Sequence, residues 1–210
     1  MTALESMDLR KSAIGNGYYR LLENWLVPLL DRWNLDPNHL TSAGVGLAAL
    51  VPPGFYLHPV AGFVLMGLSG VADSLDGVMA KKRGRSSPEG AFLDSSLDRI
   101  SDFFYLVGFW ILFRQEGHLW LATALVFAAL LITLMISYVK ARAEALGASC
   151  KVGVMERGWR TVYLLFWALV LCVVPSQRAV ILWSGLLVYL LLTGHTAVHR
   201  VRHIRSQLRG

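Results

Sequence analysis

Residues 73–98 read DSLDGVMAKKRGRSSPEGAFLDSSLD and carry four aspartates between long uncharged stretches. Asp73 and Asp76 stand three residues apart, and Asp94 and Asp98 stand four apart. Residues at these spacings share one face of a helix. Because a short turn joins the two predicted helices, they are antiparallel neighbours and their acidic faces can meet. A carboxylate costs about 2.5–3.5 kcal/mol at a bilayer centre, so this pattern requires a wet, charged site.

The sequence on both sides of this stretch is that of a membrane protein. Of its 210 residues, 55% are hydrophobic and only 16% are charged, whereas soluble domains carry roughly 25% charged residues. Residues 37–72, 117–139 and 179–199 contain no Asp, Glu, Lys or Arg. Each run is long enough to cross a bilayer, which excludes an ordinary soluble enzyme and a disordered chain.

We predict an all-α integral membrane fold with six transmembrane helices and an N-terminal interfacial amphipathic helix. The spans are predicted at residues 40–57, 60–81, 91–113, 119–139, 161–174 and 179–197. Pro52 and Pro53 should kink the first span. The interfacial helix is predicted at residues 18–33 from apolar residues at helical spacing: Leu21, Leu22, Trp25, Leu26, Leu29 and Leu30.

This pattern predicts three regions along the chain. An N-terminal tail with the interfacial helix takes residues 1–36, the six-span catalytic domain takes residues 37–199, and a basic cytoplasmic tail takes residues 200–210. Seventeen of the 20 lysines and arginines fall in the N-terminal segment, the loops after the second and fourth spans, and the tail. By the positive-inside rule, both termini lie on the cytoplasmic side of a cell membrane. The net charge of +6 therefore reflects orientation and not nucleic-acid binding.

Four carboxylates packed together repel one another unless cations compensate them. Clustered oxygen ligands suit Mg²⁺ or Mn²⁺, and two adjacent ions would fit four carboxylates, as in two-metal phosphoryl chemistry. A fifth acid, Asp102, is expected to lie in a solvated cytoplasmic vestibule or to pair with Arg99, which stands three residues before it.

The pattern D-x2-D-G-x2-A-K-x8-G-x3-D-x3-D over residues 73–98 resembles the signature of the CDP-alcohol phosphotransferase family. The family usually has Arg where this chain has Lys81, and lysine keeps the charge but loses bidentate phosphate binding. Residues 37–41 resemble the family's P-N-x-[LIV]-T element. Residues 94–102, 137–145 and 156–160 resemble the subgroup of phosphatidylinositol-phosphate and archaetidylinositol-phosphate synthases.

The resemblance implies a homodimer with a cytoplasm-facing site in each chain. It implies that the metal ions bind Asp73, Asp76, Asp94 and Asp98, and that Asp98 is also the catalytic base. The residues implied to contact the CDP part of the donor are Asp36, Pro37, Asn38, His39, Gly77, Lys81 and Ser87. For an acceptor that carries a phosphate, the cations favoured by the subgroup match are Lys140, Arg142, Arg157 and Arg160.

The implied reaction transfers a phosphatidyl group from a CDP-diacylglycerol-like lipid donor to the hydroxyl of a small polar alcohol and releases CMP. Inositol phosphate is the favoured acceptor, with glycerol 3-phosphate or serine as alternatives. Aspartate-rich membrane prenyltransferases are disfavoured because they carry two acidic motifs far apart, whereas here the four acids lie within residues 73–98. A divalent-cation carrier is the non-enzymatic alternative, since intramembrane acids also mark ion pathways.

Overall fold

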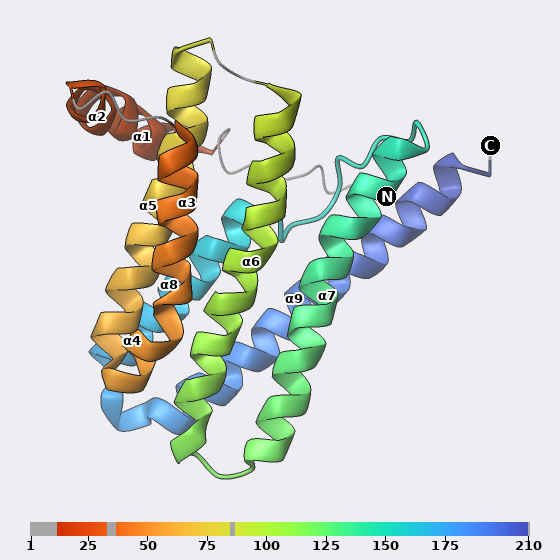
Figure 1. The fold of residues 1–210 in the computed structure, drawn as a ribbon. Helices are drawn as coiled ribbons and strands as arrows, with labels where there is room; N and C mark the ends of the chain where they lie inside the picture. The colour runs from red at the N-terminus through yellow and green to blue at the C-terminus, as the bar shows by residue number, and fades with distance from the viewer. Residues whose placement is uncertain (1–11, 33–36, 85–86, 210) are drawn as a thin grey trace. The chain divides into compact units, whose positions relative to one another are not determined.

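The computed structural model describes residues 12–32, 37–84 and 87–209, and its regular elements are helices (Figure 1). The all-α class is therefore confirmed. The chain divides into two compact units, an N-terminal unit within residues 9–111 and a C-terminal unit within residues 112–210. The predicted residue Asp36 lies outside the described ranges.

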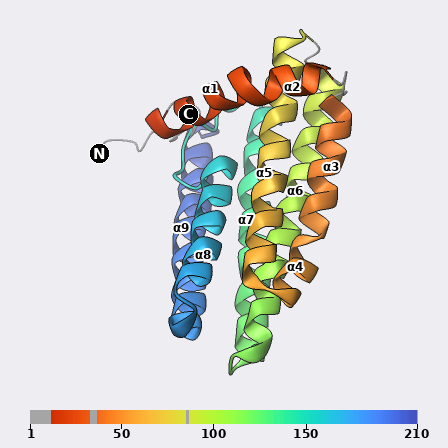
Figure 2. The ribbon, with the colours of Figure 1, turned by 90° about the vertical axis from the view of Figure 1, so that its left-hand side faces the viewer.

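The N-terminal unit contains a transverse N-terminal segment and a group of longer helices. The transverse segment comprises α1 (Ala13–Leu21), a π-helical turn (Leu22–Leu26) and α2 (Val27–Arg32). The longer group comprises α3 (Pro37–Ala49), α4 (Val51–Leu57), α5 (Pro59–Lys82) and α6 (Pro88–Leu112). Helices α3 and α4 pack along α5, and α1–α2 runs across the direction of α3 and α5 (Figure 2).

The first predicted span is broken where its prolines stand. Helix α3 ends at Ala49 and α4 begins at Val51, with Pro52 in its first turn. Proline lacks the amide hydrogen that a continuous helix needs and favours the first turn of a new one. The predicted kink is therefore confirmed. Close packing of α4 on α5 depends on Gly62, where an added Cβ would collide with the ring of Phe55.

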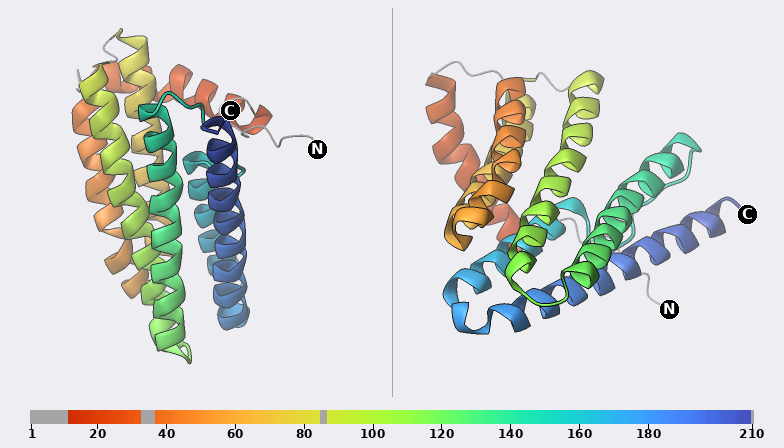
Figure 3. Two further views of the ribbon diagram at one scale, coloured as in Figure 1. Left: turned by 90° about the vertical axis from the view of Figure 1, so that its right-hand side faces the viewer. Right: turned by 60° about the horizontal axis from the view of Figure 1, so that its bottom comes forward.

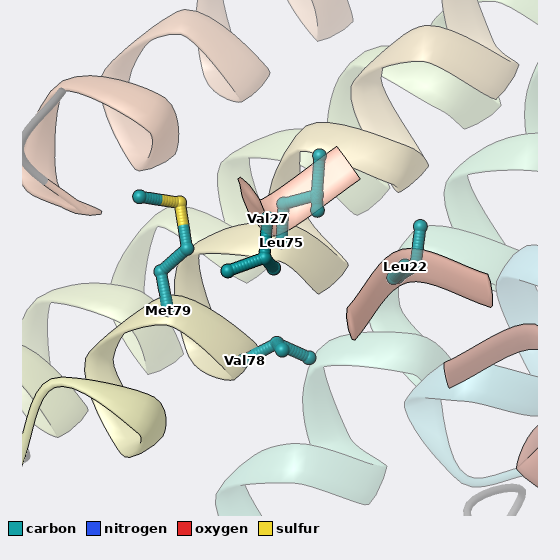
Figure 4. Close-up of a cluster of buried hydrophobic side chains, with 5 residues drawn as sticks. All are labelled: Leu22, Val27, Leu75, Val78 and Met79. Carbon is teal, nitrogen blue, oxygen red and sulfur yellow. The ribbon is translucent and has the colours of Figure 1, made fainter. Parts of the chain in front are cut away.

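The transverse segment starts earlier than the predicted residue 18. Ser12 caps α1, and its Oγ accepts a hydrogen bond of 3.0 Å from the amide of Gly15. The inward face of the segment packs on the last turns of α5 (Figure 4). Leu22 and Val27 of the segment meet Leu75, Val78 and Met79 of α5, and all five side chains are buried. The outward face carries Leu21, Trp25 and Leu29, and Trp25 is 77% exposed. Apolar residues thus occupy two faces, one against α5 and one suited to a membrane surface.

An ion pair joins the end of α2 to the end of α5. Arg83 donates to Oδ1 of Asp31 through Nη2 at 2.6 Å and through Nε at 3.1 Å. Lys82 Nζ lies 3.6 Å from Oδ2 of the same carboxylate. These hydrogen bonds and positive charges lower the pKa of Asp31.

The C-terminal unit is a group of three long helices. It contains a short 3₁₀ turn (Phe113–Gln115), α7 (Leu119–Ala145), α8 (Arg157–Val173), a second 3₁₀ turn (Pro175–Gln177) and α9 (Arg178–Gln207). Helices α7 and α9 lie side by side (Figure 3). Tyr163 donates to the carbonyl of Gly185 at 2.7 Å, and the Trp167 indole donates to Ile181 at 2.9 Å. These two bonds hold α8 to α9.

Four helical segments of the described chain have the length and apolar composition of membrane spans. They are His39–Leu57, Pro59–Lys82, Leu119–Ala145 and Pro175–Gln207, which match the predicted first, second, fourth and sixth spans. The predicted third and fifth spans coincide with α6 and α8. Helix α6 carries the acidic residues and α8 has only 17 residues, so neither qualifies by length and composition. Helix α9 continues through residues 200–207 of the predicted tail.

We expect the Asp31→Asn substitution to loosen the end of α2. Because the folded-state pKa of Asp31 is lowered, its contribution is complete at neutral pH and is lost as the pH falls below about 4. Hydrogen-exchange protection factors of the amides of residues 27 and 29–32 should fall a few-fold in the variant at pH 7, as expected for an exposed pair. They should fall in the wild type only on acidification. Equal protection in both proteins at pH 7 would refute this role.

Candidate functional site

Three carboxylates from α5 and α6 meet in the N-terminal unit. Asp73, Asp94 and Asp98 each offer an oxygen atom, and these three atoms lie within 4.8 Å of one another. Asp73 and Asp94 are partly buried, and Asp98 is 8% exposed. The acidic faces of two consecutive helices therefore meet, as their spacing predicts.

Asp76 adjoins this group and is held by its own partners. The residue is 5% exposed, and its carboxylate accepts hydrogen bonds from the Thr41 side chain and from the backbone of Gly77. Its charge interacts with the charges of Asp73 and Asp94. Within the described chain, its buried Oδ2 has no hydrogen-bond partner. A buried carboxylate oxygen without a donor is unfavourable, and a bound cation would satisfy it.

The donor set fits a hard divalent cation. All the side chains offered are carboxylates, which suit Mg²⁺ or Mn²⁺. Their mutual repulsion without a cation and the orphaned oxygen of Asp76 both favour metal binding. The geometry groups three aspartates closely and places the fourth beside them.

Thr41 is a site residue that sequence reasoning did not single out. It lies in the segment 37–41 and is buried where α3 meets α5. The sequence shows that Thr41 belongs to the P-N-x-[LIV]-T element, but it does not show which group the Thr41 hydroxyl contacts. Its hydrogen bond to Asp76 makes α3 a support for the acidic site.

A polar network fixes α3, α5 and α6 one turn before Asp73. Ser69 donates to the carbonyl of Gly44 at 2.7 Å, and Tyr105 donates to Ser69 Oγ at 2.8 Å. An added Cβ at Gly44 would lie 3.4 Å from Ala72 Cβ, so α3 approaches α5 closely. The three helices that bear or support the carboxylates are thus joined by directional bonds.

The ion pair of Arg99 corrects a sequence prediction. Arg99 Nη1 lies 3.8 Å from Asp98 Oδ2 and donates to the carbonyl of Ser95, whereas pairing with Asp102 was expected. Side chains of a helix lean toward its N-terminus. Arg99 therefore reaches back toward Ser95 and not forward to Asp102.

The residues predicted to contact the CDP group lie at helix ends of the N-terminal unit. Gly77 and Lys81 are exposed on the last turns of α5, and His39 is exposed in the first turn of α3, which Pro37 and Asn38 begin. Ser87 caps α6, because its Oγ accepts a 3.0 Å hydrogen bond from the amide of Gly90.

The four predicted acceptor-binding residues lie in the C-terminal unit in different environments. Arg160 is 2% exposed and donates to the carbonyl of Met155 at 3.3 Å. Arg157 is partly buried, whereas Lys140 and Arg142 are exposed near the end of α7. The fold therefore buries one of these cations and leaves two on the surface.

Arg200 is a buried cation that the sequence analysis assigned to the tail. It is 3% exposed and donates to the carbonyls of Val152 at 2.9 Å and Ile136 at 3.1 Å. Its Nη2 lies 3.6 Å from Glu156 Oε1, and its charge interacts with that of Arg160. The available signal was its position in the run of buried α9 residues at intervals of three and four: Leu182, Leu186, Tyr189, Thr193, Thr196, Arg200 and Ile204.

Comparison with known proteins identifies the family. Residues 34–191 match the family described as CDP-alcohol phosphatidyltransferase. The chain belongs to this family. It is therefore a transferase of phospholipid synthesis that uses a CDP-activated lipid, and its four long apolar helices are those of a multi-pass membrane protein. The match removes the need for the cation-carrier alternative.

Individual relatives agree with this assignment. The archaetidylinositol phosphate synthase of Methanothermobacter thermautotrophicus is 36% identical over 159 residues, which cover 75% of this chain and 78% of the relative. The same enzyme of Aeropyrum pernix is 37% identical over 182 residues, covering 86% and 88%.

Solved structures show the same fold. The phosphatidylinositol phosphate synthase of Mycobacterium tuberculosis in complex with manganese and citrate has a TM-score of 0.75 and 28% identity, covering 85% of this chain and 87% of that one. The same enzyme with CDP-DAG bound has a TM-score of 0.71 and 28% identity, covering 85% and 91%.

We expect neutralisation of one carboxylate to have opposite effects on the melting temperature without and with a bound metal ion. Asp94→Asn should raise the melting temperature in EDTA, because it relieves repulsion with neighbouring carboxylates. It should also remove the stabilisation by Mn²⁺, which for a single site amounts to about 2.7 kcal/mol at 100 times the dissociation constant.

The exposed carboxylate of Glu144 on α7 provides the control for this experiment. Glu144→Gln should leave the Mn²⁺-dependent shift of the melting temperature unchanged. An Asp94→Asn variant that Mn²⁺ stabilises as strongly as it does the wild type would contradict a metal role for the cluster.

Proposed function

We propose that this protein transfers a phosphatidyl-type group from a CDP-diacylglycerol-like donor to the hydroxyl of inositol phosphate and releases CMP. The observation that carries the proposal is the meeting of Asp73, Asp94 and Asp98 within 4.8 Å, inside the sequence pattern of the family. The acceptor is inferred from relatives named archaetidylinositol or phosphatidylinositol phosphate synthases. Glycerol 3-phosphate and serine are the alternatives within the same chemistry.

The metal ligands of the proposal are Asp73, Asp76, Asp94 and Asp98, which would hold two Mg²⁺ or Mn²⁺ ions. Bound ions of this kind screen a diphosphate and stabilise the charge that develops on the leaving phosphate. A related solved structure is a complex with manganese, which supports a divalent metal ion as the cofactor. Thr41 would keep the Asp76 carboxylate oriented through its hydrogen bond.

Asp98 is proposed as the general base. The acceptor oxygen attacks the phosphorus that carries the lipid, a new P–O bond forms, and the bond from that phosphorus to CMP breaks. The proton of the acceptor hydroxyl passes to the Asp98 carboxylate. Arg99, with Nη1 3.8 Å from Asp98 Oδ2, would restrain that carboxylate.

The donor and the acceptor would use different polar residues. The proposed contacts of the CDP group are Asp36, Pro37, Asn38, His39, Gly77, Lys81 and Ser87. The proposed contacts of the acceptor phosphate are Lys140, Arg142, Arg157 and Arg160. Arg200 would support the second set, since it holds the backbone at Val152 and pairs with Glu156 immediately before α8.

The proposed membrane arrangement has six spans. Four are the long apolar segments, and α6 and α8 are the other two. Both termini and the active site would lie on the cytoplasmic side of the cell membrane. Within each unit, basic residues gather at one set of helix ends: at the end of α5 in the first, and at the end of α7 and start of α8 in the second. This distribution supports the positive-inside orientation. A homodimer is proposed from family resemblance.

The acceptor is tested by CMP release. Purified protein in lipid nanodiscs receives CDP-diacylglycerol, Mg²⁺ and one alcohol at a time. We expect CMP with inositol phosphate and only background release with glycerol 3-phosphate or serine. Release with glycerol 3-phosphate or serine, and none with inositol phosphate, would replace the acceptor assignment. No release with any of these alcohols would contradict the donor assignment as well.

The role of Asp98 is tested by Asp98→Asn. We expect kcat to fall by about 10²-fold or more, the range in which a lost general base places a variant, while the protein still folds. Asp102→Asn, one turn further along α6, is the matched control and should keep turnover close to wild type. A rate for Asp98→Asn near that of the control would remove Asp98 from the base role.

A further inference from the structure

The chain between α7 and α8 follows one face of the last turns of α9. This α7–α8 connection, residues 146–156, lies outside any helix. It meets α9 through side chains that recur at intervals of four, four and three: Thr196, Arg200, Ile204 and Gln207. Residues at these spacings share one face of a helix. The connection is therefore laid along α9.

The attachments of the connection run in opposite order to their partners on α9. The amide of Met155, near the end of the connection, donates to Thr196 Oγ1 at 3.2 Å. Ser149, near its start, is held by Gln207. The eleven residues between these two α9 positions rise about 16 Å, and the six steps from residue 149 to residue 155 span at most about 20 Å. The connection is thus nearly extended between its two attachments and has little slack.

A single side-chain amide makes the attachment at Ser149. Oε1 of Gln207 accepts from the Ser149 amide at 3.0 Å, and its Nε2 donates to the Ser149 carbonyl at 2.8 Å. Nε2 also lies 2.6 Å from His203 Nε2, which must accept because an amide nitrogen only donates. These bonds fix both the backbone of Ser149 and the orientation of the Gln207 amide.

The attachment at Met155 leads directly to a predicted acceptor-binding residue. Thr196 is fully buried, and its Oγ1 donates to the carbonyl of Leu192 at 2.9 Å. The same oxygen accepts from the Met155 amide, and the Met155 carbonyl accepts from Arg160 Nη1 at 3.3 Å. A chain of hydrogen bonds therefore runs from α9 through the backbone of Met155 to the guanidinium of Arg160.

We propose that Thr196 and Gln207 are positioning residues for the acceptor-phosphate site. They hold the connection extended along α9, and the connection sets where Arg157 and Arg160 stand relative to the cations at the end of α7. This inference rests on the proposed role of those cations in binding the acceptor phosphate. It gives the last turns of α9 a part in acceptor recognition.

The test uses Thr196→Val and Gln207→Ala, which each remove one attachment, and Thr196→Ser, which keeps the hydroxyl. CMP release is measured in nanodiscs with CDP-diacylglycerol, Mg²⁺ and varied inositol phosphate. Thr196→Val and Gln207→Ala should each raise the KM for inositol phosphate about 2- to 10-fold, which corresponds to one net hydrogen bond. The kcat and the KM for CDP-diacylglycerol should stay near wild type, because only acceptor binding is weakened. Thr196→Ser should keep the wild-type KM for inositol phosphate.

Thr193→Val and Ser206→Ala are the matched controls. Thr193 is buried on α9 and donates to the carbonyl of Tyr189 at 2.6 Å. Ser206 is exposed beside Gln207 and donates to the carbonyl of His203 at 2.7 Å. Both hydroxyls bond within α9 itself, so their removal should leave the KM for inositol phosphate unchanged.

Three results would overturn the inference alone. They are a wild-type KM for inositol phosphate in either Thr196→Val or Gln207→Ala, an equal rise in a matched control, or an equal rise in the KM for CDP-diacylglycerol. A wild-type protein that releases CMP with inositol phosphate in the same assay would leave the proposed function intact. A wild-type protein that releases none would overturn the proposed function and the positioning role together.

Discussion

Mutual repulsion among carboxylates held at the ends of two apolar helices is the constraint on which the N-terminal unit depends. Asp73, Asp94 and Asp98 bring their oxygens within 4.8 Å, and Asp76 adds a fourth charge beside them. Such a group opposes the approach of α5 and α6 at this point unless a cation is bound. The surrounding fold must therefore hold the two helices together and exclude alternative arrangements of these side chains.

The supports of this arrangement come from α3, α6 and the transverse segment. Ser69 joins α5 to α3 and α6 through Gly44 and Tyr105, and Thr41 holds Asp76 from α3. The transverse segment covers the opposite face of α5 with buried apolar side chains. Directional polar bonds lie on the side of the carboxylates and apolar packing lies behind them, which is the combination a preorganised metal centre requires.

The C-terminal unit meets a different electrostatic requirement. Arg160 and Arg200 are both buried, and burial of a cation is costly unless hydrogen bonds and opposite charges satisfy it. Carbonyls of Met155, Val152 and Ile136 and the carboxylate of Glu156 supply these partners. Gly153, at φ +112°, lies in the loop between α7 and α8 that supplies most of these partners. An added Cβ at this position would collide with Thr196 and meet Arg200.

The acidic faces, the break at the prolines and the family pattern are predictable from the sequence, because each depends on local spacing along one or two helices. The partner of the Thr41 hydroxyl, the burial of Arg200 and the partner of Arg99 are not predictable in this way. These depend on which helices pack together and on the direction in which long side chains lean. The order of residues along the chain specifies neither the helix pairs nor the direction of these side chains directly.

The sequence by itself thus determined the class of protein, the helical segments and the four aspartates. Apolar run length, proline position and charge spacing are properties of the chain alone. Only the tertiary structure decided which residues support those aspartates, such as Thr41 from α3, and which arginines are buried. Hydrogen bonds between residues far apart in sequence form only when packing brings a donor and an acceptor within about 3 Å.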